Sequence, residues 1–238
     1  MSEAPLDDLR RAVYRPVRSG NALEDTTARI VQTVRLGLVA PGESLPAERE
    51  LAMLYGVSRD TVREAIRELA DAGWLETRRG RYGGTFVVDP VPRAVAPAEV
   101  SAAELDDVIA LRRVLEPEAC RAAAERTLSA DDRDVLWARH EAAAAADGHD
   151  YRRLDTLLHL TIAELSGIPS LVPLVADNRA RVNAWLDTFP LLPRNIDHST
   201  SQHAAVVSAI LAGRPDAAHA AMRDHLAGSE ALLRGFLA

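Results

Sequence analysis

Four side chains in the second half of the sequence have the chemistry of metal ligands. Asp155 and His159 are spaced i,i+4 in a helical pattern, so they share one face of a predicted helix. His203 and His225 each lie on the apolar stripe of a further predicted helix. An aspartate and three imidazoles in one core are costly to bury, and a divalent cation would both neutralise and ligate them. The sequence therefore predicts a divalent metal site, and Zn²⁺, Ni²⁺ and Mn²⁺ all suit this donor set.

The other histidines do not combine an apolar face with a carboxylate partner. We therefore expect all of them at the surface: His140, His149, His198 and His219.

The metal ligands lie in a region whose pattern is helical throughout. Breakers such as Ser129, Gly148 and Pro169 divide it, and the short connections favour an antiparallel bundle of six helices. The predicted helices cover residues 103–127, 130–146, 150–166, 169–188, 198–213 and 215–236. We expect residues 103–238 to form an all-α domain.

The first part of the chain has a different pattern. Helical periodicity over 23–38 is followed by a short helix at 46–52, a turn with Gly56, and a third helix at 59–72. Two short strands, 74–77 and 85–88, then flank a glycine-rich turn. Three helices and a β-hairpin are the layout of a winged helix-turn-helix. We therefore predict a mainly α protein with a flexible arm (1–21), a DNA-binding domain (22–88), a proline-containing linker (89–102) and the helical domain.

Arginines cluster where such a domain would meet DNA. Arg59, Asp60 and Arg63 lie in the first turns of the third helix, which enters the major groove in this motif. An arginine there can bind guanine through two parallel hydrogen bonds. Arg49 is placed for the phosphate backbone, and the turn between the strands is a basic wing with Arg78, Arg79, Gly80 and Arg81. The alternative is that these arginines are solvated charges paired with nearby glutamates.

Composition is compatible with a DNA-binding protein of the cytoplasm. The net charge is −7, but residues 1–90 hold thirteen arginines against fourteen acidic side chains, so this part is almost balanced. The single cysteine excludes an intramolecular disulfide and a cysteine-rich zinc module. The sequence shows neither an apolar run of membrane-spanning length nor a secretory signal, so we expect no membrane partner.

The segment LPAERELAMLYGVSRDTVREAIRELADAGWLETRRGRYGGTFV resembles the N-terminal domain of the GntR family of bacterial transcription regulators. The resemblance covers about residues 22–88 and implies DNA contacts at Arg49, Ser58, Arg59, Asp60, Arg63 and Gly80. Many members have Thr-Pro where this chain has Asp60-Thr61. Asp60 would favour the helix dipole, repel phosphate and could accept a hydrogen bond from cytosine, which leaves the operator sequence open.

The histidine spacing resembles the FCD ligand-binding domain of the FadR subfamily, in which an aspartate and three histidines bind a metal. Asp155, His159, His203 and His225 match those ligands, and Arg112 matches an arginine that faces the effector. A guanidinium and a metal with open positions suit a small carboxylate. Asn178, Arg181 and Asn183 could add polar groups to the effector site. The alternative for Arg112 is an i,i+4 pair with Glu116.

The resemblance implies that residues 103–238 bind an effector and dimerise. It also implies a homodimeric, effector-controlled regulator that binds a near-palindromic site on double-stranded DNA. We expect a repressor, with an activator as the less common variant. Two alternatives remain. The metal could be purely structural with no effector, or the helical domain could be a metal-dependent hydrolase.

Overall fold

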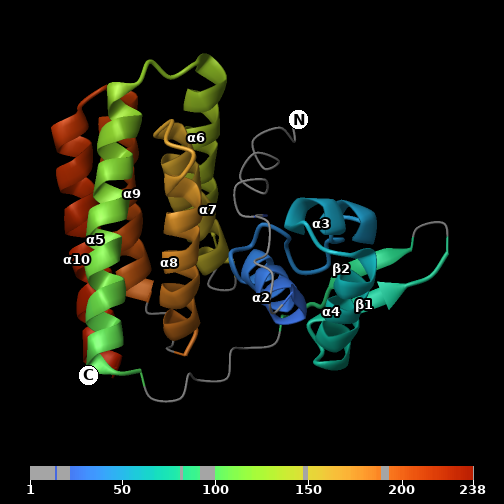
Figure 1. Cartoon of the computed structure of the whole chain (residues 1–238). Coiled ribbons are helices and arrows are strands. Elements are labelled where there is room, and N and C mark those ends of the chain that lie inside the picture. Colours follow the sequence, from blue (N-terminus) through green and yellow to red (C-terminus); the bar gives the residue numbers. More distant parts are fainter. Residues whose placement is uncertain are drawn as a thin grey trace. The chain divides into compact units, whose positions relative to one another are not determined.

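The computed structural model describes residues 14, 22–80, 83–91, 100–146, 150–188 and 193–237. Contacts divide the chain into two compact units, Met1–Arg93 and Ala94–Ala238. The predicted fold class is confirmed, since the first unit holds helices and a two-stranded hairpin and the second is helical (Figure 1). None of the helices that the structure describes is long and apolar enough to cross a membrane.

The first unit is built around three helices and the hairpin. They are α2 (Ala22–Arg35), α3 (Glu48–Tyr55), α4 (Arg59–Asp71), β1 (Leu75–Arg78) and β2 (Gly84–Val87). The strands are antiparallel, with Leu75 opposite Val87 and Arg78 opposite Gly84. Ile30, Leu51, Val62 and Leu69 pack with Val87 into one core, so each of these elements buries one face.

The turn between α3 and α4 sets the start of α4. Gly56 ends α3 in the left-handed region at φ 68°, which favours glycine. Ser58 then caps α4, because its side-chain oxygen accepts a hydrogen bond from the Thr61 backbone N–H at 3.0 Å. This cap fixes where the first turn of α4, with Arg59 and Asp60, begins.

The second unit is a bundle of six helices within the described residues (Figure 1). They are α5 (Ala102–Glu125), α6 (Ala130–Ala144), α7 (Tyr151–Leu165), α8 (Leu171–Leu186), α9 (Pro193–Leu211) and α10 (Pro215–Leu237). Helix α10 packs against α5 and α9, and α7 packs against α5, α6 and α8. Short connections make chain neighbours antiparallel, and this arrangement directs side chains of α5, α7, α9 and α10 into one interior.

Candidate metal centre and DNA-binding face

The structure brings the four predicted metal ligands together. Asp155 and His159 come from α7, His203 from α9 and His225 from α10, and one ligand atom of each lies within 4.8 Å of the others. The Nε2 atom of His203 is 3.2 Å from Nε2 of His159 and 3.3 Å from Nε2 of His225. Asp155 Oδ1 completes the group at 3.3 Å from His203 Nε2. Three imidazole nitrogens and a carboxylate oxygen therefore face one another.

The protonation of the imidazoles suits a metal. Burial lowers the pKa of His159, His203 and His225, that of His203 to about 3, so all three are neutral at pH 7. A neutral imidazole has one nitrogen with a free lone pair. At 3.2 and 3.3 Å, each neighbouring pair of Nε2 atoms can share at most one proton in a hydrogen bond, whereas a cation would accept the lone pairs of all three. The donor set therefore fits a divalent metal, with tetrahedral or higher coordination.

Two carboxylates are held ionised around these imidazoles. Burial would raise the pKa of Asp155, but the Arg179 guanidinium, together with the three histidines, outweighs burial and places this pKa below its usual range. Burial would also raise the pKa of Glu116, and Arg112, His159 and Arg179 hold it well below the usual range. Both side chains are therefore anions despite their burial.

Glu116 orients His159, a role that the sequence analysis missed. Its Oε2 atom accepts a hydrogen bond from Nδ1 of His159, and its Oε1 atom accepts one from Nε of Arg112 at 2.7 Å. Because an ionised carboxylate only accepts, His159 must carry its proton on Nδ1, and its Nε2 lone pair is directed to the ligand cluster. The sequence signal was present as the i,i+4 pair of Arg112 and Glu116, but nothing in it linked α5 to His159.

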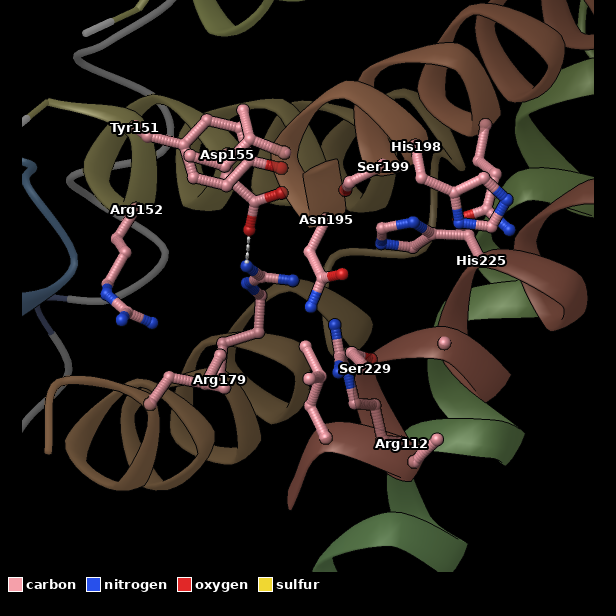
Figure 2. Close-up of a pocket in the computed structure, with 16 residues that line it drawn as sticks. Arg112, Tyr151, Arg152, Asp155, Arg179, Asn195, His198, Ser199, His225 and Ser229 are labelled. Carbon is pink, nitrogen blue, oxygen red and sulfur yellow. Dashed lines mark hydrogen bonds and ion pairs between the residues drawn. The ribbon is translucent and has the colours of Figure 1, made fainter. Parts of the chain in front are cut away.

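A cavity of about 380 Å³ adjoins the ligand cluster. Asp155 and His225 line it, together with Arg112, Arg179 and polar side chains such as Asn195 (Figure 2). Arg112 lines the cavity and pairs with Glu116 at the same time, and its Nη1 atom donates to Ser229 Oγ at 2.8 Å. Pairing with Glu116 therefore does not prevent Arg112 from facing an effector in the cavity.

The other three predicted effector residues are not among those that line this cavity. Asn178 is buried and donates to the backbone oxygen of Val108, and Asn183 donates to Thr156. Arg181 is exposed on α8 and forms an ion pair with Glu104 at 3.0 Å. Arg179, two residues before it, is buried and lines the cavity instead. Helix α8 therefore contributes to the cavity lining, but through Arg179 and not through the three polar residues that the sequence pattern suggested.

The prediction for His140 is wrong. This residue is buried with 8% exposure, on the face of α6 that also buries Leu136 and Ala143. Those neighbours at −4 and +3 were a signal of burial that the search for a carboxylate partner overlooked. His198 is exposed. His219 is partly buried, and its Nε2 atom lies 3.2 Å from Oε1 of Glu118. His149 lies outside the described residues.

The predicted DNA-contacting side chains of α3 and α4 are exposed, namely Arg49, Ser58, Arg59, Asp60 and Arg63. Arg63 forms ion pairs through Nη2 with Glu48 Oε2 of α3 at 3.0 Å and through Nη1 with Asp60 Oδ1 at 3.1 Å. The Nη2 atom of Arg59 lies 4.0 Å from the same Glu48 oxygen. In the DNA-free protein these arginines therefore do pair with nearby acidic side chains, as the alternative interpretation predicted. Such exposed pairs contribute about 0–1 kcal/mol, so phosphate or base contacts can replace them.

The wing is also exposed and built by glycine geometry. Arg78, Arg79 and Gly80 are exposed at the end of β1, and the guanidinium of Arg78 lies 4.2 Å from the ring centroid of Phe86. Gly80 has φ 107°, and a Cβ atom at Gly83 would lie 2.5 Å from the Arg78 carbonyl oxygen. The turn therefore requires glycine at both positions. Arg81 lies outside the described residues.

Family models match both halves of the chain. Residues 23–87 match the model of the bacterial regulatory proteins of the gntR family, and residues 107–228 match the FCD domain. The chain belongs to the GntR family. Its FCD domain assigns it to the FadR-like members, and its N-terminal domain implies DNA binding.

Relatives of this GntR-family chain are transcription regulators and not enzymes. It is 30% identical to the "Putative HTH-type transcriptional regulator RmpR" of Mycobacterium gastri, over 90% of this chain and 81% of that protein. It is 32% identical to the "Putative L-lactate dehydrogenase operon regulatory protein" of Escherichia coli, over 82% and 80%. The solved structure of E. coli McbR/YncC has the same fold, with a TM-score of 0.56 and 19% identity over 90% of this chain and 97% of that one.

Proposed function

We propose that this GntR-family regulator senses a small carboxylate through a divalent metal held by Asp155, His159, His203 and His225. As a homodimer, it would bind a near-palindromic operator in the cytoplasm and repress transcription until the carboxylate binds. The observation that carries the proposal is the convergence of four ligand atoms, three of them from buried histidines, next to a cavity lined by Arg112.

The donor set supports Zn²⁺, Ni²⁺ or Mn²⁺ as the metal. Three imidazoles and one carboxylate are borderline-to-hard ligands, and four protein ligands leave positions open in a five- or six-coordinate ion. The bound metal would supply a positive centre for a carboxylate oxygen at the side of the cavity. Arg112 would orient the carboxylate through its planar guanidinium, which Glu116 and Ser229 hold in place.

The cavity favours an effector over a purely structural metal. A volume of about 380 Å³ is within the range of small-molecule sites, and a structural metal needs no such space. The relative named for an L-lactate dehydrogenase operon agrees with a small carboxylate, because lactate belongs to that chemical class.

The DNA half of the proposal rests on exposed side chains of α4 and of the wing. Arg59 and Arg63 would contact base edges, while Arg49, Arg78 and Arg79 would contact phosphates. One recognition helix reads only a short half-site, so a dimer with two helices in successive major grooves explains a near-palindromic operator.

Thermal melting tests the metal and the effector in one series. The chelated protein is melted alone, then with each divalent metal, then with metal and small carboxylates. A metal at a hundred times its dissociation constant stabilises the folded state by about 2.7 kcal/mol, so we expect a clear rise in Tm and a further rise for one carboxylate. A metal response without any carboxylate response would favour the structural-metal alternative.

Matched histidine variants show whether the metal is bound at the proposed site. His203→Ala should abolish the metal-dependent rise in Tm, because it removes a ligand from the centre of the cluster. His219→Ala, a histidine paired with Glu118 outside the cluster, should retain the full rise. Equal metal responses in the two variants would refute the four-ligand site.

A further inference from the structure

The side chains at the start of α4 form a charge cluster with the first residue of α3, and its charges cancel. The cluster consists of Glu48, Arg59, Asp60 and Arg63. Arg63 pairs with Glu48 at 3.0 Å through Nη2 and with Asp60 at 3.1 Å through Nη1. Arg59 approaches the same Glu48 oxygen at 4.0 Å. Two arginines that would contact base edges are thus accompanied by two carboxylates.

The helices of the DNA-binding unit differ in charge from its β-hairpin. Together α3 and α4 hold four arginines and six acidic side chains. The segment from β1 to β2, residues 75–87, has three arginines and one glutamate. Binding to phosphates depends on uncompensated positive charge, because cationic side chains release the counterions of DNA. The hairpin, rather than the helix pair, therefore has the net charge that phosphate binding needs.

A guanine edge and a phosphate make different demands on the two arginines of the charge cluster. Guanine presents two neutral acceptors, N7 and O6, and uses the N–H donors of an arginine. A phosphate is an anion and is attracted by the charge of the arginine. The surface ion pairs are weak, but a phosphate that replaces them comes to lie next to Glu48 and Asp60, which repel it. The cluster therefore disfavours phosphate and not guanine.

We propose that Glu48 and Asp60 set the specificity of DNA binding. They neutralise Arg59 and Arg63, so these arginines gain little from the phosphates of random DNA and bind where a base edge accepts their hydrogen bonds. The two carboxylates are thus positioning residues that increase the ratio of operator affinity to non-specific affinity. This ratio decides occupancy in a cell, because a genome offers far more non-specific sites than operators. The inference rests on the proposed contacts of Arg59 and Arg63 with base edges.

Titrations with two kinds of DNA test this inference. The wild-type protein first selects its preferred duplex from a library with a randomised central segment, and a duplex of scrambled sequence represents non-specific DNA. Fluorescence anisotropy gives both dissociation constants between about 50 and 200 mM salt. In Asp60→Asn and Glu48→Gln the affinity ratio should fall about three- to tenfold, chiefly because scrambled DNA binds more tightly. The slope of log K against log salt on scrambled DNA should steepen by about 0.9 for each arginine that gains a phosphate.

Two further variants separate the charge cluster from net charge. Glu64→Gln removes the same charge from α4, but Glu64 pairs with Arg67 outside the cluster, so the affinity ratio should change little. In an Arg63→Ala background, Asp60→Asn should raise the affinity for scrambled DNA much less than it does alone, because its partner is absent. The side chain of Asp60 is 89% exposed and that of Glu48 33%, so neither substitution opens the core.

The failure of this inference can be told from the failure of the proposed function. An unchanged ratio and salt slope in both carboxylate variants would overturn the inference, as would an equal fall of the ratio in Glu64→Gln. Weaker binding of the selected duplex by Asp60→Asn, with scrambled DNA unaffected, would also overturn it, because Asp60 would then contact a base itself. If the wild-type protein selects no preferred duplex, or Arg59→Ala and Arg63→Ala leave the ratio unchanged, the proposed base contacts are wrong and the inference falls with them.

Discussion

A single buried carboxylate joins the two chemical functions that we assign to the helical domain. Glu116 is 3% exposed and accepts hydrogen bonds from Arg112, which lines the cavity, and from His159, a proposed metal ligand. Removing its charge would leave the guanidinium of Arg112 with one less partner and His159 free to change tautomer. Glu116 is therefore a positioning residue for both the effector site and the metal site.

Glu116→Gln should weaken metal binding about 10- to 100-fold, the usual effect of losing a partner of a ligating histidine. Competition with a chromophoric chelator measures the dissociation constant, and ¹⁵N NMR of the imidazoles reports the tautomer of His159. Glu118→Gln is the matched control on the same helix, since Glu118 is 55% exposed and pairs with Arg121 and His219. Equal metal affinity and an unchanged tautomer in Glu116→Gln would contradict this role.

The limits of prediction at this scale follow from what a side chain contacts. Asp155 and His159 could be paired from sequence because i,i+4 spacing alone places them on one face. Arg179 and Glu116 act through residues on other helices, 24 and 43 positions away in the sequence. Such partners depend on how helices pack, and a periodic pattern on one helix does not encode it.

At the scale of elements, α4 is the best-predicted part of the DNA-binding unit. Its cap at Ser58 and its buried stripe, Val62, Ala65, Ile66 and Leu69, agree with the sequence analysis. The end of α2 was less predictable. The helix stops at Arg35, but Leu36 and Leu38 are still buried in the turn that follows, where Gly37 has φ 70°. Burial continues past the helix, so apolar spacing extended the predicted helix to Leu38.

Arg63→Ala should cost about 1–3 kcal/mol of operator binding and relax the base preference at one position of each half-site, if Arg63 reads a base. The ion pair with Glu48 must be given up on binding, but it is exposed and weak. Arg67→Ala is the control on the same helix, because Arg67 is exposed and bound to Glu64. Mobility-shift titrations with operator variants measure both effects. An unchanged affinity and base preference in Arg63→Ala would exclude Arg63 from base recognition.

At the scale of the whole molecule, the two parts of the chain differ in net charge as well as in predicted function. The total of −7 would suggest a protein that avoids DNA, yet residues 1–90 are almost neutral and expose arginines on α4 and the wing. Residues 91–238 hold fifteen arginines against twenty-one acidic side chains, so most of the net negative charge lies in this part of the chain. The net charge is therefore compatible with DNA binding, which the layout of helices and hairpin and the arginines on them predicted.

Acid should destabilise the metal-free protein through its buried histidines. Burial lowers the pKa of His159, His203 and His225, that of His203 to about 3. In the unfolded chain the pKa of a histidine is about 6.5. Between these values the unfolded state binds more protons than the folded state, so stability rises with pH and is lost as pH falls from about 6.5 toward 3. Asp155 and Glu116 act in the same direction below about pH 4, because their pKa values are lowered in the folded state.

Urea unfolding of the chelated protein between pH 4.5 and 7.5 measures this slope. His203→Gln should flatten it, since one group with a large shift is removed, and His219→Gln should leave it unchanged because His219 lies outside the cluster. Bound metal needs neutral imidazoles, so the extra stability that metal gives at pH 7 should shrink over the same interval. A free energy of unfolding that is constant or rises toward acid would show that these histidines are not buried as neutral groups, and the geometry of the proposed metal site would then be wrong.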